Sequence, residues 1–210
     1  MNIHTFGDSH ASDKHSHWGY INMADINMAD VKIKCNHIGG RLMFTFGRLG
    51  LNLLNIKDYA VEEDDVVIFC FGEIDCRNHV HKHITKEKSY KNVIEEIVRN
   101  YFNAIRENVS QYNNLKTCVY NVVPPHRYRD EPKYHRYPFL GSDIERREYY
   151  LYMNQLLREL CIENNYFYFD IYDESCDEEG FIKDEFSDGN VHLRNTTHSI
   201  EVIKRLLIEK

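Results

Sequence analysis

The chain has 210 residues, enough for one domain with a modest insertion, and its 42% hydrophobic and 28% charged residues are typical of a globular protein. A formal net charge of -7 supplies no overall positive field to attract a phosphate backbone, and the longest apolar run, residues 66–71, is far short of the ~20 residues that span a bilayer. We therefore expect no nucleic-acid partner and no membrane span.

The N-terminus and the cysteines bear on the cellular compartment. The first ten residues, MNIHTFGDSH, have neither the basic start nor the apolar core of a secretory signal, which favours an intracellular, cytoplasmic protein. The six cysteines are scattered without a C-x-x-C pair, which disfavours structural zinc and a disulfide framework. We expect reduced thiols, packed mostly as small apolar groups.

Five short runs rich in β-branched or aromatic residues alternate with helical patterns along the chain. This alternation is typical of an α/β domain with a largely parallel sheet. We predict that residues 1–210 form a single domain of this class. The predicted strands are residues 2–6, 31–35, 66–71, 117–123 and 166–171.

The helical patterns differ in length and in their start signals. After Ser89, apolar residues recur every three or four positions up to Ile105, which predicts a long amphipathic helix. Ser142 and Glu145 fit a capping box ahead of a second long helix that we expect to end near residues 164–165. We also predict a shorter helix over residues 42–54. The last residues predict a closing amphipathic helix, with one apolar side made of Ile200, Ile203, Leu206 and Leu207.

Residues 124–141 interrupt the alternation, since they hold all four prolines among several Tyr, His and Arg residues. We predict a long loop after the fourth strand, and such loops in compact domains are often lids or binding loops. Its side chains could stack on sugar rings, pack as an ordinary surface loop or form a subunit contact, and the sequence leaves these three interpretations open.

Candidate catalytic residues lie at the two ends of the chain. The first predicted strand ends in Gly7-Asp8-Ser9, which places a serine at the edge of the sheet where open α/β folds bind ligands. Near the other end, Asp188 precedes His192. A serine nucleophile needs a general base, and the base needs a partner that fixes its tautomer. Ser9, His192 and Asp188 can fill these roles, although Gly, Asp and Ser are also ordinary turn residues.

Glycines follow the next two strands at the same edge. Gly39 and Gly40 follow the second strand, and Gly72 follows the third. Glycines there allow backbone N–H groups to approach a developing oxyanion. We therefore consider these glycines candidates for an oxyanion site.

Taken in order, these four short blocks resemble the SGNH, or GDSL-like, hydrolase superfamily over nearly the whole chain. Gly7 to Ser9 look like the first block, Gly39 or Gly40 like the second, residues 72–75 like the third and residues 188–192 like the fifth. The resemblance implies a three-layer α/β/α sandwich with a flavodoxin-like parallel sheet of five strands. It also implies hydrolysis or transfer of acyl groups through an acyl-serine, without a metal or cofactor.

Two departures from that pattern bear on activity. The third block is usually G-x-N-D, with the Asn donating to the oxyanion, but Ile74 stands at that position. The fifth block is usually D-x-x-H, whereas Asp188 lies four positions before His192 and Gly189 holds the expected place. A bulge would restore the contact. Otherwise a backbone carbonyl or Asp184 would orient the histidine.

The third block also resembles a branch of the superfamily that carries G-E-I-D-C-R and is associated with polysaccharide modification. If the chain stays extended there, Glu73, Asp75, Arg77 and His79 point to one side, where they would face the substrate. Arg77 would then donate to an oxyanion or to an acidic sugar. An internal pair between Arg77 and a carboxylate is the equally weighted alternative.

The alternating histidines His79, His81 and His83 invite a metal interpretation. No acidic or cysteine ligand at a familiar spacing completes a set of four, so we expect a solvated loop without metal.

The sequence therefore predicts a serine-dependent O-acyl, and specifically O-acetyl, esterase or acyltransferase whose substrate is a carbohydrate or an acylated small molecule. A non-catalytic glycan-binding or assembly module on the same scaffold is the alternative from another class, motivated by Ile74 and by the spacing of Asp188. Hydrolysis of a lipid or another small ester is a third interpretation. The oligomeric state is left open.

Overall fold

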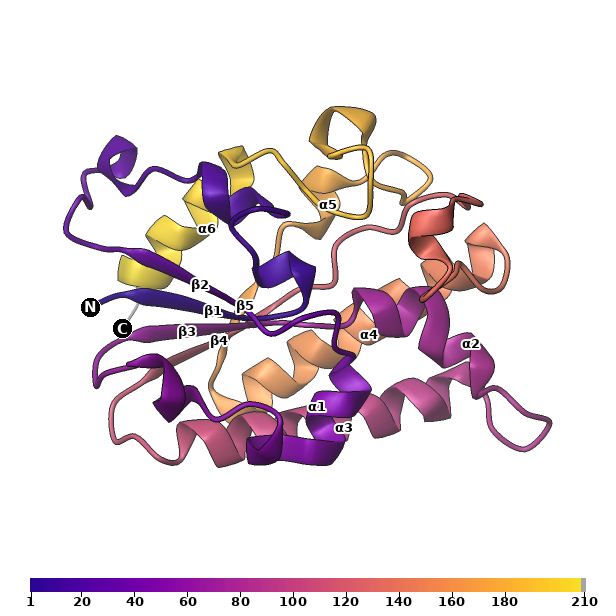
Figure 1. Ribbon diagram of the computed structural model, residues 1–210, viewed down its shortest axis with the longest axis horizontal. Coiled ribbons are helices and arrows are strands. Elements are labelled where there is room, and N and C mark those ends of the chain that lie inside the picture. Colours follow the sequence, from indigo (N-terminus) through magenta and orange to yellow (C-terminus); the bar gives the residue numbers. More distant parts are fainter. Residues whose placement is uncertain (209–210) are drawn as a thin grey trace.

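The computed structural model describes residues 1–208, which form a parallel five-stranded sheet with helices on both faces (Figure 1). Every strand pairing is parallel. The strand order β2-β1-β3-β4-β5 is the doubly wound order of flavodoxin-like folds, and the predicted fold class is confirmed. The strands are β1 (Ile3–Gly7), β2 (Ile33–His37), β3 (Val66–Cys70), β4 (Lys116–Tyr120) and β5 (Phe167–Phe169).

The helices fill the connections between the strands. Short 3-10 turns occur in several loops, and the π-helical segment Asp75–His79 leads directly into α2. The helices are α1 (Met43–Leu49), α2 (Val80–Lys82), α3 (Tyr90–Val109), α4 (Asp143–Asn164), α5 (Tyr172–Ser175) and α6 (Thr197–Ile208).

The two long helices begin where the sequence predicts. Ser89 and Asn92 form a reciprocal capping box at the start of α3, and Ser142 and Glu145 form one at the start of α4. These side chains satisfy N–H groups that have no partner within a helix. At the end of α4, Asn165 adopts a left-handed conformation (φ 55°) and closes the helix.

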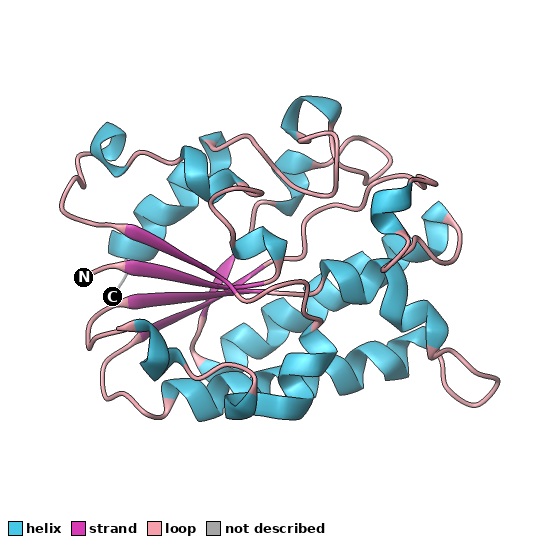
Figure 2. Cartoon of the chain, in the orientation of Figure 1, coloured by secondary structure: helices cyan, strands magenta, loops and turns pink. Residues whose placement is uncertain are grey.

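Helices cover both faces of the sheet, as Figures 1 and 2 show, and a hydrophobic core lies on each face. On one face α1, α3 and α4 pack around Phe46, Phe69 and Tyr101. On the other face α6 and the N-terminal 3-10 segments pack around Trp18. Since both faces are covered, β1 and β3 are buried along their whole length.

The carboxyl ends of the strands bring distant segments together. Ser9 follows β1, Gly39 follows β2 and Gly72 follows β3, and these three strands are neighbours in the sheet. The strand order reverses at β1, so these segments meet at the switch point where open α/β sheets bind ligands. Trp18 helps fix this edge, because its indole N–H donates to the carbonyl of His10 at 2.8 Å.

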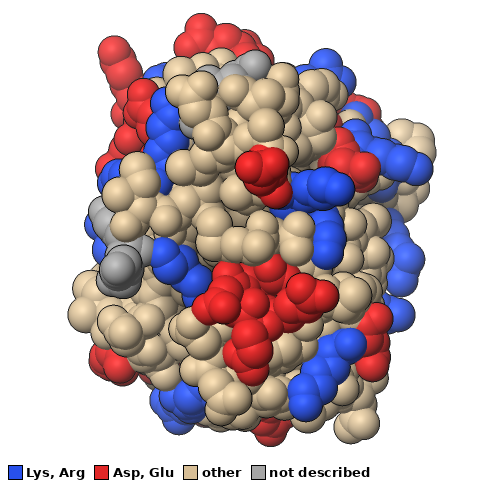
Figure 3. All heavy atoms as spheres, turned by 90° about the vertical axis from the view of Figure 1, so that its left-hand side faces the viewer, with Lys and Arg blue, Asp and Glu red and all other residues tan. Residues whose placement is uncertain are grey.

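The chain after β4 forms the predicted long loop, visible in Figure 2, with one 3-10 turn at Pro132–Tyr134. At the opposite end of the sheet, where the strands begin, acidic side chains gather in the middle of the surface (Figure 3). The loop ahead of β3 exposes three of the acidic residues of this chain, Glu62, Glu63 and Asp64. No helix within residues 1–208 combines the length and the apolar character needed to cross a bilayer.

Candidate active site

The structure brings the two ends of the chain together at Ser9, His192 and Asp188. The Ser9 hydroxyl lies 2.7 Å from Nε2 of His192, and Nδ1 of His192 lies 2.9 Å from Oδ2 of Asp188. A carboxylate only accepts hydrogen bonds, so Nδ1 carries the ring proton and Nε2 accepts from the serine. This is the arrangement in which an imidazole can remove the serine proton.

A tight turn accommodates the unusual spacing between Asp188 and His192. Gly189 has a φ of 79°, which an L side chain rarely adopts, and Ser187 and Leu193 pair across the turn as an antiparallel bridge. The N–H of Asp188 donates to the carbonyl of His192 at 3.1 Å. The turn therefore absorbs the extra residue, and Asp188 reaches the ring.

The surroundings keep Asp188 ionised and His192 neutral. Burial by itself would raise the pKa of Asp188, but hydrogen bonds from the His192 ring and from the N–H of Asn190 outweigh it and lower the pKa. His192 is only 8% exposed. Its burial lowers its pKa below the usual 6.5, which Asp188 opposes and the nearby ring of His10 reinforces. Histidine in this state is ready to act as a base.

Two backbone N–H groups at this edge of the sheet are candidate donors to an oxyanion. Among residues 1–208, neither the N–H of Ser9 nor that of Gly39 donates a hydrogen bond. Gly39 has a φ of 84°, a conformation that suits glycine. Next to it, the carbonyl of Gly40 accepts from the hydroxyl of Tyr137 at 3.0 Å. Cδ1 of Ile74 lies 3.9 Å from the position that a Cβ on Gly40 would take, so an apolar group lies beside Gly40.

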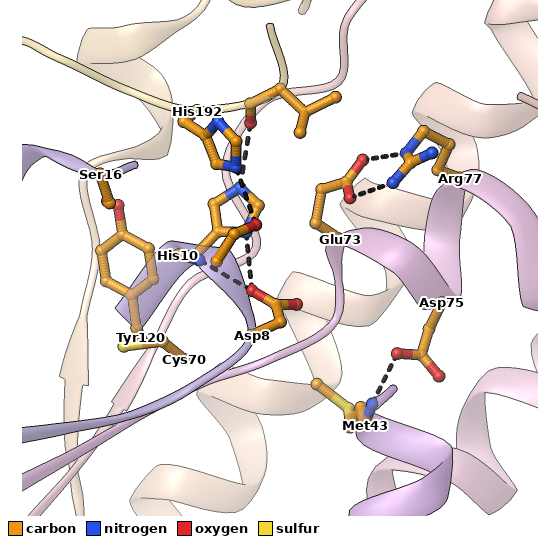
Figure 4. Close-up of polar contacts among 12 residues, drawn as sticks. Asp8, His10, Ser16, Met43, Cys70, Glu73, Asp75, Arg77, Tyr120 and His192 are labelled. Carbon is orange, nitrogen blue, oxygen red and sulfur yellow. Dashed lines mark hydrogen bonds and ion pairs between the residues drawn. The ribbon is translucent and has the colours of Figure 1, made fainter. Parts of the chain in front are cut away.

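The predicted extended conformation of residues 73–79 is wrong. This segment is helical, with a π-helical stretch at Asp75–His79, so its alternate side chains do not share one side. Glu73 and Arg77 are four residues apart and form a buried pair, with 2.6 Å between Nε of Arg77 and Oε1 of Glu73 (Figure 4). Arg77 also donates to the carbonyl of Tyr137. The structure therefore contains the internal pair between Arg77 and a carboxylate, and not the predicted row of side chains that would face the substrate.

The other residues predicted for this segment have structural partners. Asp75 accepts from the N–H groups of Met43 and Phe44 and caps α1, and Figure 4 shows it turned toward Met43, away from His192. Gly72 (φ 123°) leaves no room for a side chain, because an added Cβ would lie 2.7 Å from Val122. The ring of His79 packs on Phe44, with ring centroids 4.5 Å apart. None of these contacts involves Ser9 or His192.

The long loop after β4 contacts the turn that carries the base. The hydroxyl of Tyr134 donates to Asn190 at 2.7 Å, and Arg129 donates to the carbonyl of Gly189 at 2.7 Å. Tyr134, Phe139 and Val191 form a small apolar cluster. The loop therefore braces the neighbours of His192 in sequence, a role that its composition alone does not reveal.

His10 is the residue that sequence reasoning passed over. It is buried directly behind Ser9, and its ring centroid lies 5.0 Å from that of His192. Its position immediately after the candidate nucleophile is the one signal that the sequence offers. Within residues 1–208, no group of three or more His, Cys, Asp or Glu side chains is arranged to hold a metal ion, and all six cysteines are free thiols.

Comparison with solved structures supports the fold assignment. A gut microbial diltiazem-metabolizing enzyme matches 96% of this chain with a TM-score of 0.63 and 14% identity, and the chain spans 45% of the length of that protein. The aryl esterase of M. smegmatis matches with a TM-score of 0.61 and 14% identity over 98% of both chains. A carbohydrate acetylesterase from Sinorhizobium meliloti matches with a TM-score of 0.58 and 17% identity over 99% of both chains.

At these identities the likeness shows the fold. Other structures of similar fold include a GDSL-like lipase from Bacteroides thetaiotaomicron, at a TM-score of 0.59 and 11% identity over 98% of this chain and 85% of that one. No family model matches the sequence, and no curated protein matches it.

Proposed function

We propose that this chain is a serine-dependent esterase, with Ser9 as nucleophile, His192 as general base and Asp188 as the group that orients the base. The observation that carries this proposal is the continuous hydrogen-bond chain from the Ser9 hydroxyl through His192 to Asp188, at 2.7 Å and 2.9 Å. Its members come from opposite ends of the sequence. The arrangement has the geometry of a catalytic triad.

The reaction follows from these positions. His192 takes the hydroxyl proton as Ser9 Oγ bonds to the ester carbonyl carbon, and the carbonyl oxygen becomes an oxyanion. The oxyanion then reforms the carbonyl, the leaving alcohol takes the proton from His192, and an acyl-serine remains. Water attacks the acyl-serine with its proton passing to His192, and the carboxylic acid is released as the Ser9 hydroxyl is restored.

The oxyanion site has fewer donors than the family pattern implies. The N–H groups of Ser9 and Gly39 are the donors that we assign to it. Loss of one comparable donor costs proteases about 3 to 4 kcal/mol of transition-state stabilisation, or roughly 10² to 10³ in rate. We therefore expect turnover to be slow on unactivated esters and faster on aryl esters, whose leaving groups demand less stabilisation.

We propose an O-acyl group on a carbohydrate, and in particular an O-acetyl group, as the natural substrate. Two of the structural neighbours are described as a carbohydrate acetylesterase and an aryl esterase, which supports ester chemistry on this fold. The loop after β4 exposes Tyr128, whose ring lies 6.2 Å from that of Phe139 in the cluster with Val191, and a sugar ring could stack there. A sugar hydroxyl in place of water would make the same residues an acyltransferase.

Turnover on a panel of aryl acetates and acetylated sugars tests this function. Acetate release should be lost in both Ser9→Ala and His192→Ala, and a sugar acceptor added in excess should divert acetyl groups only if transfer is the reaction. Equal turnover by wild type and Ser9→Ala would contradict the proposal. Glycan binding without any turnover would instead favour the non-catalytic module, for which the apolar Ile74 beside Gly40 is the supporting observation.

A further inference from the structure

His10 connects the turn that carries Ser9 to the loop that carries His192. Its ring Nδ1 lies 2.8 Å from Oδ1 of Asp8, and its ring Nε2 lies 3.0 Å from the carbonyl oxygen of Val191. The backbone N–H of His10 also donates to Oδ1 of Asp8 at 2.9 Å. Figure 4 shows the His10 ring beneath His192 and above Asp8.

The partners of the ring determine its protonation state. A backbone carbonyl has no hydrogen to donate, so Nε2 must carry a proton to bond to Val191. The Asp8 carboxylate likewise only accepts, so Nδ1 must carry one too. A histidine that donates from both nitrogens is an imidazolium. With Asp8 ionised, the hydrogen-bond pattern therefore places a positive charge on a side chain that is only 4% exposed.

The charges around the ring are consistent with a buried cation. Burial by itself would lower the pKa of His10, but Asp8 and then Glu73 outweigh it and raise the pKa to about 9. Among residues 1–208, Oδ2 of Asp8 is buried and has no hydrogen-bond partner. The ring of His10 contacts the other carboxylate oxygen, Oδ1. Glu73 in turn is paired with Arg77. Burial and the charge of His10 lower the pKa of the His17 ring to about 3, so this ring is neutral.

We propose, on the basis of the esterase function proposed above, that His10 is a positioning residue: as a buried imidazolium it anchors the backbone beside His192 to the turn that carries Ser9. The anchor works through Val191, the residue immediately before His192 in the chain. Without it, the position of His192 relative to Ser9 would rest on its own turn and on the contacts of the loop after β4 with Gly189 and Asn190. A misplaced reacting group can cost about 100-fold in rate.

The cation also affects the base directly. Four titratable side chains interact with the ring of His192. They are Asp188 of its own turn, His10 of the turn after β1, Glu73 of the segment after β3 and His126 of the loop after β4. The exposed ring of His15 stacks on that of His192 at 5.8 Å. Among these groups His10 is a fixed positive charge that opposes protonation of His192. Replacement of His10 by a neutral residue should therefore raise the pKa of His192, by about one unit for charges this close at a partly solvated site.

NMR of histidine-labelled protein tests both statements without reference to turnover. Ring nitrogen shifts at pH 7 should show His10 protonated at both positions. In His10→Gln, the titration of His192 should move upward by about one pH unit, and the acid limb of kcat/KM should move with it while kcat falls by up to about 100-fold. A neutral His10 ring, with the proton on Asp8, would overturn the proposal. So would an unchanged His192 titration.

Two further variants separate this effect from a general loss of structure. His17→Gln removes another fully buried ring, which bonds to Ser16 and Tyr120 and not to the loop that carries His192. This variant should destabilise the fold without changing the pH at which His192 titrates. If His10→Gln folds poorly, Asp8→Asn/His10→Gln removes both buried charges together and should move the titration upward by less. Absence of turnover in the wild type would refute the esterase function, whereas the NMR titrations would still decide the role of His10.

Discussion

Replacement of Arg77 by Met should destabilise the fold severely. Arg77 is 5% exposed and Glu73 is 4% exposed, and their carboxylate–guanidinium contact uses both oxygens, at 2.6 Å and 3.0 Å. Removal of the guanidinium leaves a buried carboxylate without its cation, which typically costs about 3 to 5 kcal/mol. The guanidinium also lies 5.3 Å from the ring of Phe139 and 5.5 Å from that of Tyr134, and loss of these contacts adds about 1 kcal/mol.

The total of about 4 to 6 kcal/mol corresponds to a fall in Tm of about 10 to 20 °C for a chain of this size. Thermal unfolding followed by circular dichroism measures the loss. The matched control is Glu73→Gln/Arg77→Met, which removes the uncompensated charge and should recover at least half of it. A Tm within about 3 °C of wild type, together with lost turnover, would refute this reasoning and assign Arg77 to the substrate instead.

Three other substitutions or conditions test the site. Asp188→Asn should lower kcat by about 10⁴, because the amide favours the wrong tautomer of His192, and a loss of less than about tenfold would contradict the assigned role. Burial lowers the pKa of His192 below 6.5, so the base becomes protonated only in more acidic solution, and the acid limb of kcat/KM should have its midpoint below pH 6.5. A midpoint at or above pH 6.5 would show that another group controls the acid limb. Ile74→Asn supplies an amide beside Gly40 and should raise kcat about tenfold or more, whereas lower turnover by a folded variant would place the oxyanion elsewhere.

Local sequence signals were sufficient for the strands and the long helices. The runs before Ser9 and around residues 66–71 combine β-branched and aromatic residues, and tertiary packing keeps them as the two buried central strands. The capping boxes at Ser89 and Ser142 are reciprocal contacts between residues three apart, so they can be recognised without any tertiary information.

Other features depend on contacts between distant residues. Residues 73–79 have no clear helix start signal, and their helix is fixed by Asp75 capping α1 and by Arg77 bonding to the loop after β4. The contact between Asp188 and His192 is local, and the sequence allowed for it with a bulge, but it depends on the left-handed Gly189 in a closed turn. The contact of the His10 ring with the carbonyl of Val191 joins residues that are 181 positions apart. Pattern and spacing carry none of these long-range contacts.

The most direct measurement of the central claim is the reaction of the folded protein with a serine-reactive fluorophosphonate, followed by intact mass and peptide mapping. Ser9 is half-buried and within 2.7 Å of Nε2 of His192. One adduct per chain should form on Ser9, and its rate should fall sharply in His192→Ala. No adduct on the wild type, or an undiminished adduct in Ser9→Ala, would contradict a nucleophilic role for Ser9.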